Sequence, residues 1–564
     1  MKLNYKIKCT ALSVVLIGVS SCNVLDVDPT NSFTDASVWN DLALAETYVN
    51  DCYLNIIPES ACGSWWASLT DEVHQQHTYW TEHALDGTLS PDYPYFGVGY
   101  DDSKYRPWSS YYGSIKDVNY FMDHIDAVPA ATDEEVEWKS QLKGQGYFLR
   151  AYYYHMLYSL FGRVVLVTSA HELDAEFTET RADLDDVADY IVSQCDSAAM
   201  LLPLTYSASE DFGRATQGAA LALKGRVLLY QASPLFGTPS AEKWKKAADA
   251  NKAVIDLGVY SLKSVSDWEG YADLFLDPYN PEVIFEKMYD TKYNVEPRNM
   301  TFLYQSPSGS GSGFNGWGVH VPTLEIVDRF QNADGTPYQI EPSTEYPWDG
   351  REIRLKADIL LDGDEWGYGS SRREVEFFIS GGSGVPEGVD GPNGNAPNNT
   401  TRTAAIIRKF MNPDYDTNGT LSDNTPWFVI RLSEVYLNYA ECQIELGNNA
   451  EALKYINLVR ERALLPPATG TNIREEYEYE RQMELLFEGQ RWFDLRRWKK
   501  LEALYTNTAR YGMTITKYVD GSKQYVRSAD PIRTYHWGGE SNYWLPIPRT
   551  ENQGSPQIDL LPYE

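Results

Sequence analysis

The sequence contains few cysteines and histidines, and those it has do not form a metal-binding pattern. There are 6 Cys and 8 His among 564 residues. Four of the cysteines follow the N-terminal segment: Cys52, Cys62, Cys195 and Cys442. They include no CxxC pair and accompany no HxxxH motif, which argues against a structural zinc site. Cys195 and Cys442 fall on apolar helical faces as small core residues, and the sequence leaves open whether Cys52 and Cys62 form a disulfide.

Basic residues are also scarce. The chain has 48 Lys and Arg against 80 Asp and Glu, a formal net charge of −32 at pH 7, and its isoelectric point is about 4.6. Because proteins bind nucleic acids by neutralising phosphates with cations, this charge opposes DNA or RNA as a partner. Hydrophobic residues make up 43% of the chain, which is enough for a sizeable core and excludes an acidic disordered chain.

Long apolar runs are absent after the first residues. Near the N-terminus, three lysines precede the apolar stretch 11–19, which is too short to span a membrane and is typical of a secretory signal peptide. Small residues then precede Cys22, as in a bacterial lipobox. We therefore expect residues 1–21 to be a lipoprotein signal peptide and Cys22 to be diacylated, so that lipid alone tethers a soluble body. The alternative is a signal peptide cleaved elsewhere, with Cys22 unmodified.

Apolar residues recur at alternating steps of three and four in several segments, which predicts amphipathic helices. The predicted helices come in pairs: 142–162 with 181–202, 213–234 with 241–257, and 428–446 with 450–464. In the last pair, the turn around Gly447 looks like the inter-helix turn of a tetratricopeptide repeat, in which Gly ends one helix and a small residue, here Ala452, packs in the next. The spacing between pairs varies, so we expect repeat-like units separated by insertions.

The segment over about 262–427 has a different composition. Its Gly- and Ser-rich stretches, 306–313 and 381–395, cannot continue a helix or a strand. The short runs 283–286 and 374–379 are predicted strands. This segment is therefore predicted to be a set of long surface loops, where binding residues usually concentrate.

Together these patterns predict the fold class. It is mainly α, a tetratricopeptide-like helix-pair scaffold over about 35–260 and 428–505, with the loop-rich insertion of about 262–427 containing short strands. After the signal peptide, residues 22–564 are expected to form one domain.

Several blocks of the sequence carry a family resemblance. They are Phe148-Leu-Arg-Ala-Tyr152 with Leu160-Phe-Gly162, then residues 431–441, residues 456–462, residues 480–498, and Leu545-Pro-Ile-Pro548. The block at 480–498 is the most specific. In this order the blocks resemble the SusD/RagB family of Bacteroidetes outer-membrane lipoproteins, and the resemblance covers essentially the whole chain after Cys22.

The resemblance implies a function. Members of this family cap a TonB-dependent transporter barrel and deliver an oligosaccharide, or in some cases a peptide, to it. It thus implies a glycan-binding lipoprotein for nutrient uptake, anchored by lipid in the outer membrane and facing the cell exterior, with a SusC-like transporter as partner and no chemistry of its own. Two alternatives stay open: the same scaffold binding peptides, and a secreted glycoside hydrolase, which would need two opposed carboxylates about 5–10 Å apart.

The block at 480–498 contains two acid–base pairs three residues apart, Glu488 with Arg491 and Asp494 with Arg497. Residues at this spacing meet on the surface of a helix. No partner histidine or defined cleft accompanies them. We therefore interpret them as a buried ionic brace rather than as catalytic groups.

Aromatic residues are abundant, with 41 Tyr and 16 Trp. A sugar ring has apolar faces and a rim of hydroxyls, so its binder needs aromatic faces beside hydrogen-bonding side chains. Both kinds are concentrated in one segment: Trp65, Trp66, Asp71, His74, Gln75, His77, Tyr79 and Trp80. The resemblance also implies ligand-binding aromatics after this early helix. One alternative places one Trp of each pair in the core. Another is zinc at His74 and His77, for which Asp71 is a poor third ligand.

A second candidate ligand segment lies in the insertion: Arg298, Asn299, Tyr304, Asn315 and Trp317. Trp317 is the first choice there, because a Trp flanked by Gly on an exposed loop has little packing to explain it. A third aromatic loop and some isolated rings are further candidates: Tyr93, Tyr95, Phe96, Tyr100, Trp348, Trp366 and Tyr368.

No cofactor is predicted, apart from one candidate calcium loop. Asp414, Asp416 and Asn418 place oxygen ligands at alternate positions, and Gly follows at the sixth. The twelfth position is Thr425 where a calcium loop has a bidentate Glu. The alternative is a plain turn rich in Asp and Asn.

Overall fold

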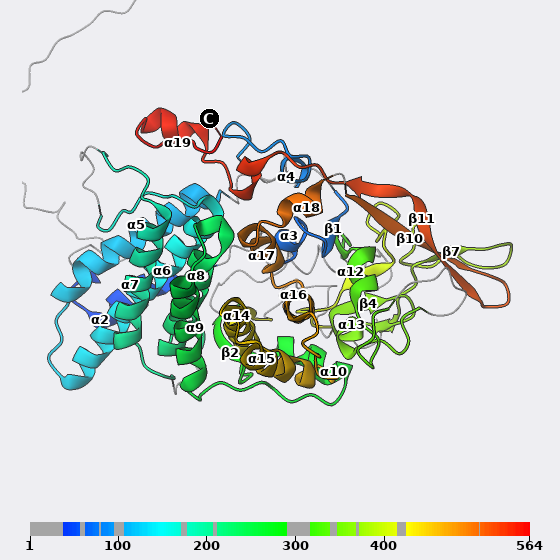
Figure 1. Cartoon of the computed structure of the whole chain (residues 1–564), viewed down its shortest axis with the longest axis horizontal. Coiled ribbons are helices and arrows are strands. Elements are labelled where there is room, and N and C mark those ends of the chain that lie inside the picture. The colour runs from blue at the N-terminus through cyan, green and yellow to red at the C-terminus, as the bar shows by residue number, and fades with distance from the viewer. Residues whose placement is uncertain are drawn as a thin grey trace, which may run out of the picture.

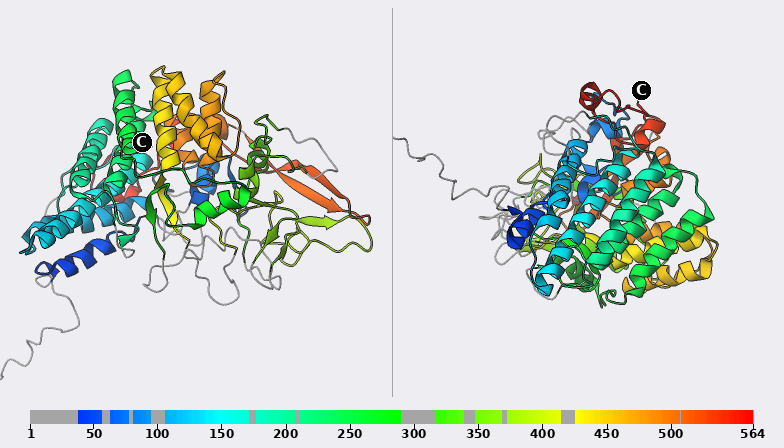
Figure 2. Two further views of the ribbon diagram at one scale, coloured as in Figure 1. Left: turned by 90° about the horizontal axis from the view of Figure 1, so that it is seen from below. Right: turned by 90° about the vertical axis from the view of Figure 1, so that its left-hand side faces the viewer.

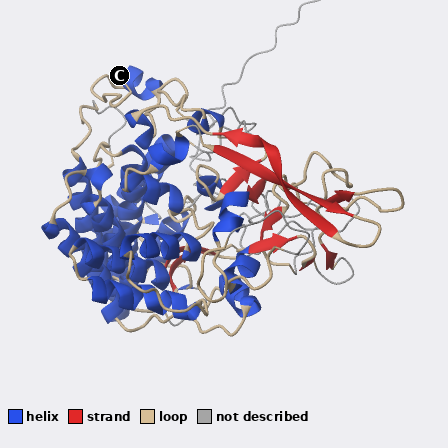
Figure 3. Ribbon diagram, turned by 45° about the vertical axis from the view of Figure 1, so that its right-hand side comes forward, coloured by secondary structure: helices blue, strands red, loops and turns tan. Residues whose placement is uncertain are grey.

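The computed structural model separates the chain into a helical part and a part with short strands and long loops (Figure 3). It describes eleven segments: residues 38–56, 63–77, 81–94, 106–170, 177–206, 211–289, 316–338, 347–367, 372–413, 425–506 and 508–563. The predicted signal peptide and Cys22 lie outside the described residues. Within these segments the fold is mainly α, as predicted.

The helical part is a row of helices that pack on their neighbours in sequence. It consists of α2 (Leu42–Asp51), α5 (Pro107–His124), α6 (Asp133–Phe161), α7 (Leu184–Leu201), α8 (Gln217–Ala232), α9 (Ala241–Asp256), α14 (Leu432–Glu445), α15 (Asn449–Arg462) and α16 (Ile473–Glu484). The contacts run from α5 through α9 and then pass to α14 and α15, although the whole insertion separates α9 from α14 in sequence (Figure 1). The three predicted helix pairs are confirmed.

The longest helix, α6, shows how the sequence determines where a helix of this row begins and which part of it is buried. Thr132 caps it: its hydroxyl accepts from the Glu135 N–H at 3.2 Å, and the Glu135 carboxylate accepts from the Thr132 N–H at 3.1 Å. This reciprocal pair satisfies backbone donors that a helix start leaves open. The second half of α6, from Phe148 to Phe161, is almost entirely buried, because α5, α7 and α8 pack around it.

The turn between α14 and α15 has the geometry predicted for it. Gly447 has φ +78°, a left-handed conformation that an L side chain adopts only with strain. Ala452, in the first turns of α15, is fully buried. A larger side chain at Ala452 would separate the two helices, whereas at Gly447 it is the left-handed backbone that favours Gly.

The strands are short and form separate small sheets. They are β1 (Val73–Gln75), β2 (Val283–Lys287), β3 (His320–Pro322), β4 (Ile359–Leu361), β5 (Glu365–Trp366), β6 (Arg373–Glu374), β7 (Phe378–Ser380), β8 (Ala405–Ile407), β9 (Trp427–Arg431), β10 (Ala509–Lys517) and β11 (Lys523–Thr534). The predicted strand at 283–286 is β2, and the run at 374–379 divides into β6 and β7. The third helix pair begins only at Leu432, because β9 precedes it and pairs with β2.

Two features of the second part were not predicted. An antiparallel ribbon of β10 and β11 extends away from the helices, with β7 parallel to β10 (Figure 2). Short helices connect the remaining segments: α3 (Gly63–Ala67), α4 (Glu82–Leu85), α10 (Trp268–Asp273), α12 (Leu324–Arg329), α13 (Ile353–Asp358), α17 (Arg491–Arg497), α18 (Leu501–Tyr505) and α19 (Arg549–Gly554).

Each part has a hydrophobic core of its own. The helical part has two, a large one around α5 to α8 and a second between α8, α9, α14 and α15. A third core fills the insertion and also contains residues of β10 and β11. Cys195 and Cys442 are buried in the helical cores, as predicted. Cys52 is also a buried free thiol whose pKa burial raises to about 12, and Cys62 lies outside the described residues.

Across the described segments, every helix is too short or too polar to pass through a lipid bilayer.

Candidate functional site

The pairing of β1 with β3 unites the two predicted ligand segments. β1 belongs to the early segment around Trp65, and β3 follows Trp317 in the insertion. The two strands are antiparallel, with His74 opposite Val321 and Gln75 opposite His320. The Gln76 N–H extends the ladder by donating to the Val319 carbonyl at 2.8 Å. The sequence treated these segments as separate candidates, and the structure places them at one ladder, called here the β1–β3 ladder.

The two tryptophans of α3 have different environments. Trp66 is buried: its ring stacks on Trp492 with 5.1 Å between centroids and contacts Phe493 at the same distance. Trp65 is partly exposed, and its ring edge meets His320 of β3 at 6.1 Å and 86°. The alternative that assigned one Trp of the pair to the core therefore describes the structure, and Trp65 is the member near the surface.

Trp317 lies directly before β3 and is 39% exposed. Gly318, which follows it, has φ +54°. A Cβ there would come within 3.4 Å of the Asn399 carbonyl oxygen. The contact alone would be tolerable, so it is the left-handed backbone that favours Gly at this position. The backbone that carries the Trp317 indole therefore has a defined conformation.

The polar side chains of β1 are buried without satisfying their hydrogen bonds. His74 and Gln75 are both nearly inaccessible. In the described part of the chain, Nε2 of His74 and both amide atoms of Gln75 have no hydrogen-bond partner. Burial, together with the nearby Arg402 and Arg533 charges, lowers the pKa of His74 to about 3, so the imidazole is neutral. Such groups are rare in native proteins.

Asp71 is held by the protein itself. Its carboxylate accepts two hydrogen bonds from Arg491, both at 3.0 Å. Burial alone would raise the pKa of Asp71, but the Arg491 guanidinium outweighs it and holds this pKa well below its usual range. A carboxylate engaged in this way fixes α17 to the start of β1. It has little capacity left for a sugar hydroxyl.

Several predicted site residues lie outside the described residues: Tyr79, Trp80, Arg298, Asn299, Tyr304, Asn315, and the calcium candidates Asp414, Asp416 and Asn418. Within the described segments, no group of three or more His, Cys, Asp or Glu side chains is arranged to hold a metal ion, and the pair His74 and His77 belongs to no such group. The calcium loop stays a prediction.

The other aromatic candidates are arranged differently. Trp348 and Trp366 are buried in the core of the insertion. Trp366 also lines a cavity of about 390 Å³ together with Trp268. Lys356 lies over the Trp268 ring at 4.8 Å and Arg408 at 4.9 Å. These cations cover the Trp268 ring, on which a ligand in the cavity would otherwise stack. Tyr93 is exposed and stacks on His83 at 4.9 Å; Tyr95, Phe96, Tyr100 and Tyr368 lie outside the described residues.

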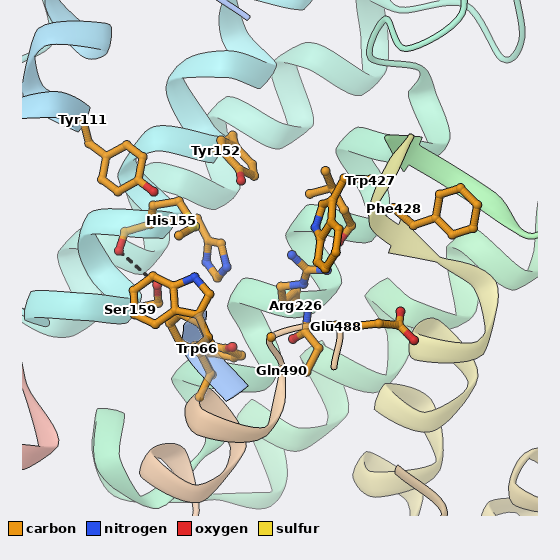
Figure 4. A pocket seen from close by; sticks show the side chains of 15 residues that line it. Trp66, Tyr111, Tyr152, His155, Ser159, Arg226, Trp427, Phe428, Glu488 and Gln490 are labelled. Carbon is orange, nitrogen blue, oxygen red and sulfur yellow. Dashed lines mark hydrogen bonds between the residues drawn. The ribbon is translucent and has the colours of Figure 1, made fainter. Parts of the chain in front are cut away.

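A second, enclosed cavity lies between the helices behind Trp66. Figure 4 shows His155, Trp66 and Tyr111 on one side of it and Arg226 and Trp427 on the other. Its volume is about 60 Å³, which suits a few water molecules and is far below the roughly 300 Å³ of a small-molecule pocket. Arg226 is ion-paired with Glu434 at 2.5 Å. This cavity is too small for a sugar ring.

Buried ion pairs connect the insertion to the helices, in what we call the ionic cluster. It contains Arg354, Lys409, Arg431, Arg462, Glu282, Glu480, Glu484 and Glu488. Arg431 is central: it contacts Glu484 and Glu488 at 2.6 Å each and Glu282 at 3.3 Å. Burial would raise the pKa of Glu484, but Arg462 and Arg431 hold this pKa well below its usual range. These carboxylates are fixed as charged partners and are not available as acids.

The predicted pair of Glu488 with Arg491 is wrong. Glu488 binds Arg431 and Lys409, and Arg491 binds Asp71. The prediction assumed one helix through 480–498, but α16 ends at Glu484 and α17 begins at Arg491, with Phe487 at φ +62° between them. The other predicted pair is confirmed: Arg497 contacts Asp494 at 2.8 Å within α17.

Two participants in this region were not found from the sequence. His320 meets Trp65 only because β1 and β3 pair, and strands of three residues carry too little pattern for that pairing to be predicted. Glu72 is fully buried, its carboxylate accepts from the Phe487 N–H at 3.3 Å, and burial and then Asp71 raise its pKa well above the usual range. The sequence feature that could have drawn attention to Glu72 is its position next to Asp71.

These features define a class of protein: a helical-repeat scaffold with a loop-rich insertion, joined by buried ion pairs and by a short ladder with tryptophans in the flanking segments. The chain belongs to the SusD family. The family model described as "SusD family" matches residues 281–563, and a second, "Starch-binding associating with outer membrane", matches residues 24–229.

Individual relatives agree with this assignment. The SusD-like protein P25 of Formosa agariphila is 24% identical over 80% of this chain and 77% of its own length. Among solved structures, a SusD-like protein from Bacteroides fragilis superposes with a TM-score of 0.78 at 25% identity, covering 94% of this chain and 99% of its own. A second B. fragilis structure, named a SusD-like carbohydrate binding protein, shares the fold with a TM-score of 0.74 at 22% identity over 93% and 100% of the two chains.

Proposed function

We propose that this chain captures an oligosaccharide at the cell surface and delivers it to a TonB-dependent, SusC-like transporter in the outer membrane. Membership of the SusD family supports this, as does the description of the second matching model, "Starch-binding associating with outer membrane". A structure with the same fold is named a carbohydrate binding protein. The observation that carries the proposal is that the Trp65 ring meets His320 of β3, the strand that pairs with β1, and that Trp317 is exposed three residues before β3.

Binding would combine ring stacking with hydrogen bonds. Trp317 presents an exposed indole, on which the apolar face of a sugar ring can stack. Gln76 and His77 directly follow β1 and are partly exposed. Both side chains carry hydrogen-bonding groups that suit the hydroxyl rim of a sugar. This mode of binding tolerates many sugars, and the surrounding loops would select among them.

The proposal includes no hydrolysis. Glycoside hydrolysis needs two carboxyl groups on either side of the bond. Among the described residues at the ladder, Asp71 is bound to Arg491, and Glu72 is fully buried beneath the surface. Their pKa values diverge, as in an acid–base pair, but neither carboxyl is open to a glycan. A binding protein therefore fits this ladder better than a glycosidase.

The test is affinity electrophoresis against host, plant and microbial polysaccharides, with a peptide mixture as a separate arm. Trp317→Ala should weaken binding of the retained glycan at least tenfold and leave the melting temperature within about 1 °C of the unsubstituted chain. Tyr518→Ala is the matched control, because this ring is 38% exposed but lies on the β10–β11 ribbon. Equal affinities for both variants would remove Trp317 from the site. Release of reducing ends by the pure protein would overturn the binding-only function, and retention of peptides alone would replace the ligand class.

Anchoring and delivery are tested in the cell. Cys22→Ala should move the protein from the membrane fraction to the soluble fraction and abolish acyl labelling. Purification of the lipidated protein in mild detergent should retain a β-barrel transporter in stoichiometric amount. Persistent labelling of the Cys22→Ala protein would refute the lipidation site, and purification without a barrel would refute the delivery role.

A further inference from the structure

A groove lies between residues of the helical part and residues of the insertion, and none of its lining residues belongs to the β1–β3 ladder. Its volume is about 260 Å³. One wall is formed by residues 204–206, 211–214 and 216, which precede α8, and the other by residues 278–280 and 283–286, which include most of β2. This volume is close to that of a small ligand pocket.

Two aromatic rings stand at this groove. Tyr279 is 62% exposed and Phe212 is 41% exposed, and their ring centroids are 4.8 Å apart at 60°. The position of Tyr279 is fixed by its backbone: its N–H donates to Asp277 at 3.0 Å, and Asn280 next to it donates to the Leu274 carbonyl at 2.9 Å. Single exposed rings are common on protein surfaces, but a fixed pair beside a concave surface is typical of a binding platform.

A buried carboxyl group completes the groove. Glu286 of β2 is 5% exposed and lines the groove. Within the described residues, its Oε2 atom has no hydrogen-bond partner. Burial, and then the charge of Asp277, raises the pKa of Glu286 to about 8. At neutral pH this carboxyl is therefore mainly protonated, and it can both donate and accept a hydrogen bond.

The charges around the groove do not favour an ionic ligand. Arg214 lines it, but its guanidinium is bound to Asp211 at 2.8 Å, to Glu46 at 2.9 Å and to Asn50 at 2.7 Å. An anion would therefore find no unpaired guanidinium there. A cation would have to ionise Glu286 in its buried position. A neutral ligand with an apolar face and hydroxyl groups needs neither an unpaired guanidinium nor an ionised Glu286.

We propose that this groove is a second saccharide subsite, in which a neutral sugar ring stacks on Tyr279 and Phe212 and a hydroxyl group bonds to Glu286. The inference rests on the proposed function, because it assigns a second contact with the glycan. Two subsites on one chain would hold a long glycan by two contacts, which raises the overall affinity above that of either contact alone.

The experiment uses calorimetry with four neutral trisaccharides: maltotriose, cellotriose, xylotriose and mannotriose. The unsubstituted chain should bind two molecules of at least one of them. Tyr279→Ala and Trp317→Ala should each retain one, and the double variant should retain none. Hydrogen exchange should show protection of residues 277–287 by the trisaccharide in Trp317→Ala but not in Tyr279→Ala. Glu286→Gln keeps a hydrogen-bonding group and should bind within threefold of the unsubstituted chain, whereas Glu286→Leu should lose at least tenfold in affinity at the groove.

The outcomes separate the two proposals. If Trp317→Ala abolishes all binding and Tyr279→Ala changes neither stoichiometry nor exchange, the groove is not a subsite and the proposed ladder site stands. If Tyr279→Ala abolishes binding and Trp317→Ala has no effect, the groove is confirmed and the ladder site fails. Absence of binding to all four trisaccharides in the unsubstituted chain contradicts the subsite. Binding of Nα-acetyl-lysine methylamide to the groove in their place would also overturn it, in favour of a cation.

Discussion

The ionic cluster and the β1–β3 ladder both bury polar side chains, but they treat them in opposite ways. In the cluster, the charged groups meet inside the protein, and Arg431 alone contacts three glutamates. At the ladder, His74 and Gln75 are buried with atoms that lack hydrogen-bond partners in the described part of the chain. The cluster contains glutamates of the most specific sequence block, residues 480–498. These charged groups pair with one another's partners inside the protein and stabilise the fold. The ladder has weaker sequence motifs, but Trp317 is exposed beside it.

The largest expected effect comes from breaking the cluster. Arg431→Met would leave Glu282, Glu484 and Glu488 buried without their central cation, and it should lower the free energy of unfolding by about 3–5 kcal/mol. The control is Arg372→Met, whose exposed pair with Glu365 at 2.8 Å should contribute less than about 1 kcal/mol. Urea denaturation measures both. Equal shifts in the two midpoints would show that the cluster does not hold the insertion to the helices.

A second pair of substitutions compares a buried with an exposed tryptophan. Trp66→Ala removes the ring that stacks on Trp492 and should cost about 3–5 kcal/mol of stability, because a cavity is left in the core. Trp317→Ala should cost less than about 0.5 kcal/mol, because the ring is exposed. Thermal denaturation followed by circular dichroism distinguishes them. A large loss of stability in Trp317→Ala would mean that this indole is part of the core and not of a binding surface.

The two regions should also respond to acid in different ranges. Burial lowers the pKa of His74 and of His320 to about 3, while an unfolded histidine titrates near 6.5. Between these values the unfolded state binds more protons, so stability falls as pH decreases below 6.5, by about 1.4 kcal/mol per pH unit for each group. The lowered pKa of Glu484 matters only below about pH 4.5, where the unfolded carboxyl group protonates.

His74→Gln should therefore flatten the loss of stability between pH 6.5 and 4.5, and Glu484→Gln should leave that slope unchanged. Urea midpoints at half-unit pH steps measure it. An unchanged slope in His74→Gln would mean that the imidazole is already protonated in the folded protein.

The smallest expected effect concerns Asp71, which lies beside the ladder but behaves like a member of the cluster. Asp71→Asn should lower stability by about 1–3 kcal/mol, because the largely buried Arg491 loses its charged partner, and it should not change glycan affinity. Asp92→Asn is the matched control, since Asp92 also binds an arginine, Arg549, through two hydrogen bonds but on the exposed surface. A loss of glycan binding without a loss of stability would make Asp71 a ligand contact.

The helical scaffold could be predicted from the sequence because each helix repeats its apolar pattern over several turns. The insertion could not, since its strands have few residues and find partners far away, as β1 does with β3. Trp65 and Trp317 were both named from the sequence, but the contact of Trp65 with His320, three residues after Trp317, depends on that pairing. The partner of Glu488 was missed because the chain leaves the helix at Glu484, and side-chain spacing predicts contacts only while the helix continues. The β10–β11 ribbon had one local signal, the turn at Asp520 and Gly521.

The contact between α9 and α14 imposes an order on folding. The face of α9 that packs on α14 stays uncovered until the whole insertion has been synthesised, because α14 follows it in the chain. Contacts between residues so far apart in sequence form slowly. Until they form, the exposed apolar faces of the chain are prone to aggregation. We expect a chain truncated before Leu432 to be insoluble or bound to chaperones. The last helices therefore close the repeat row, and the chain completes its scaffold only near its end.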